Sequence, residues 1–446
     1  MQAVKQVHLS RNSVNNHGIF RFILGLVIDI VTLFNLPPLT KLLQEFSTDI
    51  VIIGGGFGGL ICAIKARDLG HSVIVLEREK ETGYPVRTSG ATYVDDMNRF
   101  DIPETLYHKV EKCIFASQNN SAEFVDNKKR ICILDIRGVL QHLAEKAAKA
   151  GAEIFLSTNA TKVNWDGDKV IGCEASRFSQ QLSFKSQMLI DASGFTNFIN
   201  GQLKDKPKKN WTIFGLGAEY EAYVENLDEL TTMLLVGSDV APSGYAWVFP
   251  TGKNRARIGV GVTKPKDPAN PMEYLDNMLK NRPRALKDFG RIVPLEFHVG
   301  SIPVAEVPEK IAGKGWMMIG DAACQANPIV GEGIRQAMIF GEHAAKIASE
   351  AIKKQDFSEK ILSKYEELWN DEFEKKYKIG RIIQKKISEY SDEKWDDGID
   401  TLKILDTDEF YSFIKSDFSK KFLFGLVTRH PKLAANSIVK LITGLM

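Results

Sequence analysis

A chain of 446 residues is longer than one simple hydrophobic core organises, so we expect two or three interleaved domains. The net charge of +2, without a compact basic cluster, gives no reason to expect nucleic acid as a partner. The cysteines are far apart and form no C-x-x-C pair, which argues against a zinc site or a disulfide framework, so no bound metal is expected. This cysteine usage fits a reducing, cytoplasmic location.

Residues 1–45 are expected to form an N-terminal apolar extension. The run from Ile19 to Leu36 contains Arg21 and Asp29, and it falls short of the about 20 apolar residues that a membrane-spanning helix needs. Three interpretations stay open, namely a packed or interfacial helix, a leader without fixed structure, and a membrane anchor.

The first motif that indicates a binding function is the pattern of a dinucleotide-binding unit. Ile50–Ile53 predicts a buried parallel strand, Leu60–Leu69 a helix and Ser72–Leu76 a second strand. A G-x-G-x-x-G turn lies between the first strand and the helix. Its glycines allow a tight turn, close approach of the backbone to a pyrophosphate, and packing of the helix on the strand. The acid after the second strand can bind ribose hydroxyls. The predicted cofactor-binding residues here are Gly54, Gly56, Phe57, Gly58, Gly59, Glu77 and Arg78.

A second motif far along the chain distinguishes FAD from NAD. The expected strand Trp316–Ile319 leads into Gly320-Asp321, where the aspartate is well placed for the ribityl chain of FAD. A glycine loop follows that lets the backbone pass close to the isoalloxazine ring, and the next helix directs its positive end at the ring. The predicted residues in this half are Gly320, Asp321, Gly331, Gly333 and Ile334.

Smaller features agree with an FAD domain. Arg137 precedes an expected helix that ends at Lys149, and an arginine at such a place often reaches the FAD pyrophosphate. A solvent-exposed ion pair explains Arg137 nearly as well. Asp191 and Gly194 follow another strand, and we expect a structural role for both.

Together with these flavin motifs, the segment Gly244–Pro250 resembles the geranylgeranyl reductase family, whose Y-x-W-x-F-P motif it matches. The resemblance spans roughly residues 49–348. The flavin motifs alone are shared by the wider hydroxylase-like flavoprotein superfamily. The resemblance implies an FAD-dependent reductase that saturates isoprenoid C=C bonds of a geranylgeranyl lipid or diphosphate by hydride transfer from reduced flavin.

The aromatic segment suits such a substrate. Tyr245, Trp247 and Phe249 alternate along a strand, so their side chains share one face. With Pro250 they would form an apolar slot for a polyisoprenoid chain. An ordinary core face of a sheet produces the same alternation.

One position departs from the family pattern. Archaeal members often have a Cys-Gly pair in the loop after the second strand, and this chain has Ser89-Gly90 there. A hydroxyl is a weaker acid than a thiol, whose unperturbed pKa is about 8.5. The proton for saturation is therefore expected from water or from the two predicted catalytic residues, Ser89 and Tyr245. The departure also supports the alternative of a hydroxylase-type flavin monooxygenase that uses NAD(P)H and oxygen.

The order of the motifs predicts an α/β fold, with a Rossmann-like FAD-binding domain, an inserted antiparallel-sheet substrate domain and a helical C-terminal region. The expected bounds are 46–200 and 300–352 with a small insertion near 96–127, then 201–299, and 353–446. The amphipathic chain end fits either a cap over the substrate slot or peripheral contact with the inner face of a membrane. Without a second dinucleotide motif in the sequence, we expect an external electron donor, namely NADPH, a deazaflavin or a ferredoxin.

Overall fold

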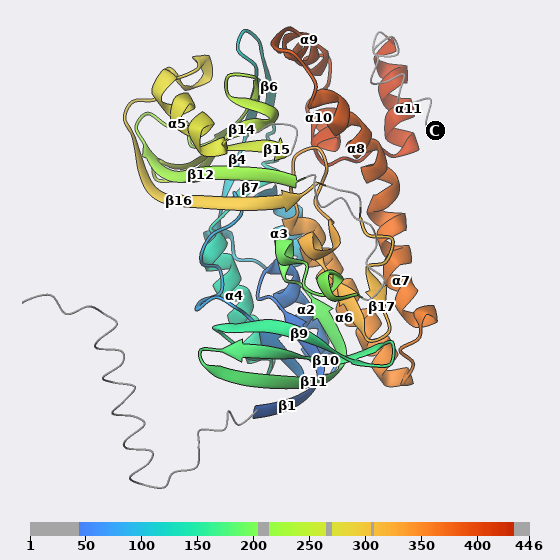
Figure 1. Cartoon of the computed structure of the whole chain (residues 1–446). Coiled ribbons are helices and arrows are strands. Elements are labelled where there is room, and N and C mark those ends of the chain that lie inside the picture. The colour runs from blue at the N-terminus through green and yellow to red at the C-terminus, as the bar shows by residue number, and fades with distance from the viewer. Residues whose placement is uncertain (1–43, 204–213, 265–269, 305–306, 432–446) are drawn as a thin grey trace, which may run out of the picture. The chain divides into compact units, whose positions relative to one another are not determined.

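The structure is a computed structural model that describes residues 44–203, 214–264, 270–304 and 307–431 (Figure 1). The apolar run Ile19–Leu36 and the chain end after residue 431 lie outside the described residues. The chain divides into residues 1–44 and 45–446, and the architecture below is that of the second unit.

The first sheet carries the dinucleotide motif. Its strands follow the order β17 (Ala312–Gly313), β18 (Trp316–Met318), β11 (Gln180–Asp191), β1 (Gln44–Ile53), β2 (Val73–Leu76) and β8 (Glu153–Phe155), and β10 (Lys169–Arg177) pairs with β11 and with β9 (Thr158–Asp166). β1, β2 and β8 run parallel to one another. Parallel strands are covered on both faces, which explains why β2 and the second half of β1 are continuous apolar runs.

Three helices accompany this sheet, α2 (Phe57–Asp68), α4 (Ile136–Lys149) and α6 (Ile334–Lys354). α2 packs against both of the others. The crossing of α2 and α6 is a backbone contact, because a Cβ atom at Gly341 would lie 2.4 Å from the carbonyl oxygen of Gly58. The small side chains that follow on α6, Ala344, Ala345 and Ala348, are buried.

The second sheet has seven strands in the order β16 (Ile292–Pro303), β12 (Phe214–Val224), β15 (Arg255–Lys264), β14 (Ala241–Gly252), β13 (Thr231–Gly237), β5 (Lys112–Ala116) and β6 (Ser121–Val125). All neighbours are antiparallel except β13 and β5. Helix α5 (Pro271–Asn281) packs on one face, over residues such as Val248 and Ile258. The strands β5 and β6 come from the segment expected as a small insertion, so this sheet is built from two separate stretches of chain.

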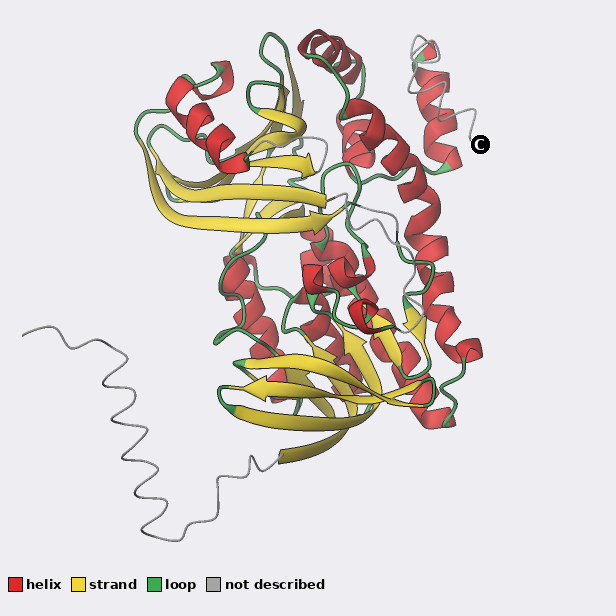
Figure 2. Cartoon of the chain, viewed as in Figure 1, coloured by secondary structure: helices red, strands yellow, loops and turns green. Residues whose placement is uncertain are grey.

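A small third sheet and the C-terminal helices complete the unit (Figure 2). The small sheet has the order β3 (Ala91–Tyr93), β7 (Ile131–Leu134) and β4 (Tyr107–Val110). The C-terminal helices are α7 (Glu359–Trp369), α8 (Lys375–Ile387), α9 (Asp392–Leu402), α10 (Thr407–Ile414) and α11 (Lys420–Arg429). α7 contacts β17 of the first sheet, whereas α9 contacts β6 and β13 of the second, so the helical region joins the two sheets.

The predicted fold class is confirmed, with a Rossmann-like parallel core, a largely antiparallel second sheet and a helical C-terminal region. Among the residues that the structure describes, no helix combines the length and the apolarity needed to cross a bilayer.

Gly341→Ala is expected to destabilise the protein, because the added methyl group would collide with the Gly58 carbonyl oxygen. A backbone atom cannot rotate away, so α2 and α6 must separate, at a cost of about 1–3 kcal/mol. Gly201→Ala is the control, since a Cβ atom there would meet nothing within 4 Å. Urea unfolding followed by circular dichroism should give a lower midpoint only for Gly341→Ala. Equal midpoints would contradict this account of the helix crossing.

Candidate active site

One cavity of about 940 Å³ is lined by residues of all three sheets and of the C-terminal helices. This volume is near the upper end of the roughly 300–1,000 Å³ that is usual for small-molecule sites. The lining extends from the glycine loop after β1 to helix α11. The residues predicted for the cofactor and those predicted for the substrate therefore face the same space.

The glycines of the first motif differ in what surrounds them. Gly54 has a φ of +106°, and a Cβ atom there would lie 2.2 Å from the carbonyl oxygen of Ala192. A Cβ atom on Gly59 would lie 2.0 Å from the carbonyl oxygen of Gly54, so this glycine lets α2 pack onto β1. Gly56 is different, because a Cβ atom there would meet no protein atom within 4 Å. Its open side lines the cavity and leaves room for a ligand.

The start of α2 is suited to an anion. Gly56 occupies the N-cap position, no side chain caps the helix there, and the first turn contains no acidic residue. The free N–H groups and the positive end of the helix dipole are therefore available to a phosphate. Phe57 and Gly58 begin the helix and line the cavity.

Glu77 is held at the edge of the cavity by two backbone amides. Its Oε2 accepts a hydrogen bond from the Gly55 N–H at 2.7 Å, and its Oε1 accepts one from the Glu79 N–H at 2.9 Å. Each carboxylate oxygen keeps a lone pair for a ligand hydroxyl. The neighbouring Arg78 also lines the cavity and donates to the Thr196 hydroxyl at 3.1 Å.

Three predicted residues do not line the cavity, namely Arg137, Gly59 and Pro250. The Arg137 side chain is 57% exposed and pairs with Glu81, which is the solvent-exposed ion pair that the sequence left open. Gly59 acts in packing, as described above. Pro250 lies in β14 beside the aromatic face without lining the cavity.

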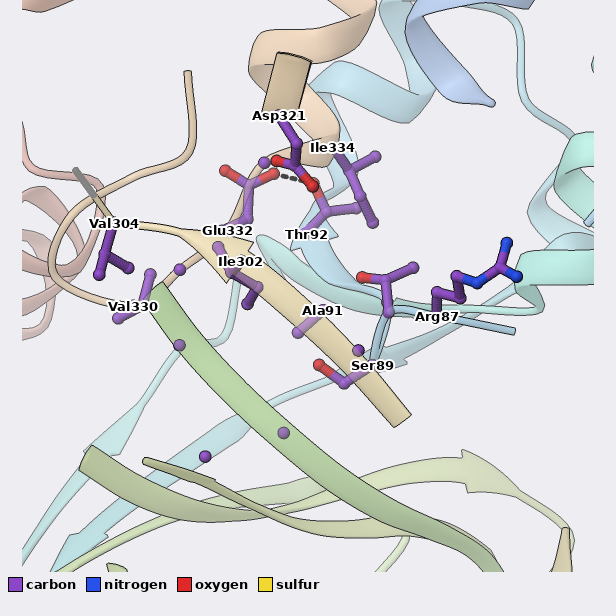
Figure 3. Close-up of a pocket in the computed structure, with 18 of the residues that line it drawn as sticks. Arg87, Ser89, Ala91, Thr92, Ile302, Val304, Asp321, Val330, Glu332 and Ile334 are labelled. Atoms are coloured by element: carbon purple, nitrogen blue, oxygen red, sulfur yellow. Dashed lines mark hydrogen bonds between the residues drawn. The ribbon is translucent and has the colours of Figure 1, made fainter. Parts of the chain in front are cut away.

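The second half of the cofactor site follows β18. Asp321 lines the cavity, and among the described residues none donates a hydrogen bond to its carboxylate. Burial raises the pKa of this carboxyl to about 6. Figure 3 shows Asp321 and Ile334 together at one end of the cavity, beside Glu332. A buried acceptor without a protein partner fits a residue that binds a ligand hydroxyl.

The loop before α6 is built from backbone and small residues. Gly331 has a φ of +66°, and Gly333 is the N-cap of α6. Glu332 stands between them, where its Oε1 accepts hydrogen bonds from the Arg335 N–H at 2.8 Å and from the Thr92 hydroxyl at 3.3 Å. This loop lines the cavity, and the hydrogen bonds of Glu332 hold the loop in its conformation.

The inner face of the second sheet carries a row of glycines. Tyr245 is opposite Gly261, which is opposite Gly217, which is opposite Gly300. We call these three glycines the glycine row. All three line the cavity. A Cβ atom would lie 3.3 Å from the Trp247 ring at Gly261, 3.5 Å from that ring at Gly217, and 2.5 Å from the Arg87 carbonyl oxygen at Gly300, so these glycines make room for that ring and that backbone.

The three aromatic residues of β14 line the cavity beside this row. The ring centroids of Tyr245 and Trp247 are 5.7 Å apart, and those of Trp247 and Phe249 are 6.1 Å apart. The Tyr245 hydroxyl donates a hydrogen bond to the Val330 carbonyl oxygen at 2.5 Å, and burial raises its pKa well above the usual value. The proton that we expected Tyr245 to supply is thus engaged in holding the loop before Gly331.

Ser89 lines the cavity, and Figure 3 shows it close to Ala91 and β16. Its loop is fixed by the buried Arg257, whose Nη1 donates to the carbonyl oxygens of Ser89 and Leu134, both at 2.9 Å. None of the five cysteines forms a disulfide, and all five are buried. Cys113 also lines the cavity, but burial raises its pKa to about 11, so this thiol is a weak acid.

Sequence reasoning missed two buried polar residues of the cavity, Glu219 and His298. Glu219 Oε2 accepts a hydrogen bond from Trp247 Nε1 at 2.7 Å, and Glu219 Oε1 lies 2.9 Å from His298 Nδ1. The available signal was a pair of acids, Glu219 and Glu221, two residues apart in an otherwise largely apolar stretch of β12. The pairing of Glu219 with His298 could not be read, because it depends on the register of β12 and β16.

The far part of the cavity is largely apolar, although Gln384, Ser388 and Thr401 also line it. Side chains of the C-terminal helices and their connecting loops line it, namely Ile387, Trp395, Leu402, Leu405, Phe410, Phe413, Ile414, Phe418, Phe422, Leu423, Leu426 and Val427. This lining continues from the aromatic face of β14, so one apolar channel joins the second sheet to α11.

Comparisons with known proteins agree with this geometry. The family model of FAD dependent oxidoreductases matches residues 49–199, and that of the geranylgeranyl reductase catalytic domain matches residues 215–301. A digeranylgeranylglycerophospholipid reductase of Methanocaldococcus jannaschii is 32% identical over 384 residues, which cover 84% of this chain and 95% of the relative. Digeranylgeranylglycerophospholipid reductase 2 of Methanopyrus kandleri is 27% identical over 390 residues, covering 86% and 97%.

Solved structures show the same fold. A geranylgeranyl bacteriochlorophyll reductase-like protein of Thermoplasma acidophilum has a TM-score of 0.79 and 26% identity, covering 90% of this chain and 100% of that one. A probable FAD-dependent monooxygenase of Pseudomonas aeruginosa has a TM-score of 0.59 at 16% identity, covering 79% and 99%, which shows the shared fold alone.

The predicted cofactor, FAD, and the predicted enzyme class are confirmed by these matches. The similarity extends beyond the flavin motifs to nearly the full length of the relatives. The chain belongs to the geranylgeranyl reductase family of FAD-dependent oxidoreductases.

Proposed function

We propose that this enzyme saturates isoprenoid C=C bonds of a geranylgeranyl lipid. One observation carries the proposal, namely that the aromatic face of β14 and the apolar lining of α8–α11 continue one another in the cavity that the flavin motifs enter. A polyisoprenoid chain is long and apolar, so it needs a channel of this kind rather than a compact pocket. The names of the reductase relatives support a lipid substrate.

In this proposal, the first motif binds the FAD pyrophosphate at Gly56 and the start of α2, with Glu77 at the ribose and Asp321 at the ribityl chain. The loop of Gly331 and Gly333, which lines the cavity, would face the ring. FAD in its reduced form supplies the hydride. The chain's own contribution would be to exclude water and to hold the double bond beside the aromatic face of β14.

We assign Tyr245 a positioning role, because its hydroxyl holds the Val330 carbonyl and its acidity is low. Ser89 lines the cavity, but a serine hydroxyl is a weak acid, and Cys113 is also weak here. None of these three groups is a strong proton source. An external donor, namely NADPH, a reduced deazaflavin or a ferredoxin, would reduce the cofactor.

We also propose that α11 contacts a membrane surface peripherally, as the sequence allowed. The buried side of the helix lines the cavity through Leu423, while Phe424 is 75% exposed on its other side. The flanking Lys420, Lys421 and Arg429 are exposed as well. Exposed aromatic and basic residues on one short helix suit the interface of an anionic bilayer, from which a lipid substrate would have to leave.

Asp321→Asn is expected to weaken FAD binding and to stabilise the apoprotein. The folded-state pKa of about 6 lies above the usual 3.8, so wild-type stability falls as the pH rises from about 4 to 6. The asparagine does not ionise, so the variant keeps this part of the free energy of unfolding, which amounts to at most about 3 kcal/mol above pH 6. FAD affinity should fall by about ten- to a hundredfold, because a charged hydrogen-bond acceptor is lost.

Thermal unfolding of both apoproteins at pH 4 and pH 7, with FAD titration by fluorescence, tests this pair of changes. Equal stability is expected at pH 4 and a more stable variant at pH 7. An unchanged FAD affinity would show that Asp321 does not bind the cofactor.

The function itself is tested anaerobically. Dithionite-reduced holoenzyme mixed with a geranylgeranylated glycerolipid or geranylgeranyl diphosphate should be reoxidised, with a product heavier by two hydrogens for each bond saturated. Reduction by NADPH, a deazaflavin or ferredoxin in place of dithionite identifies the donor. No reoxidation with either substrate, together with NADPH-dependent oxygen uptake in air with an aromatic substrate, would favour the monooxygenase.

Phe424→Ser is expected to weaken binding to anionic phospholipid vesicles by about tenfold or more, since burying a phenylalanine side chain contributes about 1.5–3 kcal/mol. Phe178→Ser is the matched control, because Phe178 is 83% exposed in the turn between β10 and β11. Vesicle sedimentation measures both variants. An equal loss of vesicle binding in both variants, or no loss in either, would exclude α11 as the membrane contact.

A further inference from the structure

The loop before α6 carries one acidic side chain, that of Glu332, between Gly331 and Gly333. All three residues line the cavity. Figure 3 shows Glu332 beside Asp321 and Ile334, at the end of the cavity where the second flavin motif lies. The G-x-G pattern leaves the type of the middle residue open, so a carboxylate in the loop that would face the isoalloxazine ring requires an explanation of its own.

The two helices that begin at the cavity differ in the charge at their N-termini. At α2 no side chain caps the helix and the first turn contains no acidic residue, so the positive end of the dipole is open to an anion. At α6, Glu332 Oε1 accepts a hydrogen bond from the N–H of Arg335, the second residue of the helix, at 2.8 Å. The positive end that we expected at the flavin ring is therefore partly neutralised by a carboxylate.

The Glu332 carboxylate is fixed by one of its oxygens and weakly screened at the other. Oε1 also accepts a hydrogen bond from the Thr92 hydroxyl at 3.3 Å. Oε2 is buried and has no hydrogen-bond partner among the described residues. A buried oxygen without a donor lies in a medium of low dielectric constant, so the charge of the carboxylate acts over several ångströms.

The other charged groups of this cluster lie behind the loop. Glu332 interacts electrostatically with Arg335 and with Asp96, and Lys415 interacts with the same two residues. Two cations thus balance two carboxylates, which allows the partly buried cluster to hold its charges. Of these four groups only Glu332 lines the cavity. The cluster therefore presents its negative side to the cofactor.

Reduction adds negative charge to FAD, so this carboxylate affects the two oxidation states differently. The oxidised cofactor takes up two electrons and one proton, and the reduced ring therefore carries one more negative charge than the oxidised ring. A fixed negative charge nearby disfavours the reduced form, and so lowers the reduction potential. The two electrons and the proton later leave together as the hydride.

An isoprenoid C=C bond carries no electron-withdrawing group, so its reduction depends on a strong hydride donor. We propose that Glu332 lowers the reduction potential of the bound FAD and thereby strengthens hydride donation to the lipid, an inference that rests on the function proposed above. Glu332 acts through the cofactor and is a positioning residue for charge, without contact with the reacting carbon atoms.

Glu332→Gln tests the proposal, because the amide oxygen can accept both hydrogen bonds of Oε1 while the charge is lost. The holoprotein is equilibrated anaerobically with a reference dye of known potential, without lipid. At a fixed potential the ratio of reduced to oxidised FAD should rise by about tenfold, which corresponds to a shift of about 30 mV for a two-electron couple.

Glu342→Gln is the matched control, since Glu342 lies on the same helix, pairs with Arg99 and Lys346, and does not line the cavity. Its FAD potential should equal that of the wild type. Glu332→Ala removes the charge and the hydrogen-bond acceptor, so its potential should rise as in Glu332→Gln while its unfolding temperature falls. A shift in the alanine variant alone would assign the effect to the shape of the loop and would overturn the proposal.

Single-turnover reoxidation by a geranylgeranylated glycerolipid links the potential to the reaction. The reduced Glu332→Gln holoenzyme should react about two- to tenfold more slowly than the wild type, since the transition state carries part of the change in charge. A wild-type rate in this variant, or an unchanged or lowered FAD potential, would overturn the inference. If the wild-type enzyme is not reoxidised by lipid, the proposed function fails, and the potentials measured without lipid still decide the role of Glu332.

Discussion

The absence of side chains at chosen positions is the constraint on which this site depends. Strands are about 4.8 Å apart, so a sheet face normally fills with side chains. Glycines on three adjacent strands interrupt that filling, because Gly261 and Gly217 leave room for the Trp247 ring and Gly300 leaves room for the Arg87 backbone. The same device lets α2 approach β1 at Gly59 and lets the Trp247 ring cross Gly259. The close packing around the cavity is therefore specified by residues that have no side chain.

Hydrogen bonds from the second sheet to the backbone join elements that are distant in sequence. Tyr245 links the second sheet to the flavin loop through Val330, and Arg257 links it to the Ser89 loop. Both links end on backbone carbonyls, so they set the position of loops without depending on the side chains there. The substrate face and the cofactor loops are consequently held in one fixed arrangement, which hydride transfer over a short distance requires.

The features that could be predicted from the sequence are those that depend on contiguous residues. The turn at Gly54–Gly59, the Gly320-Asp321 pair and the alternation along β14 are local patterns with local causes. The Glu219–His298 pair joins residues 79 apart and depends on strand register, which no short pattern encodes. Arg137 shows a related limit, because its type suited a pyrophosphate but its side chain faces solvent beside Glu81. The origin of β5 and β6 in a presumed insertion was equally hidden.

Burial makes the polar residues of the cavity informative. A lone acid among apolar side chains destabilises a fold by several kcal/mol unless its charge is compensated. Glu219 is compensated on both oxygens, yet Nε2 of His298 is left without a hydrogen-bond partner. Packing alone does not require such an arrangement, since apolar residues would fill the same space without the loss.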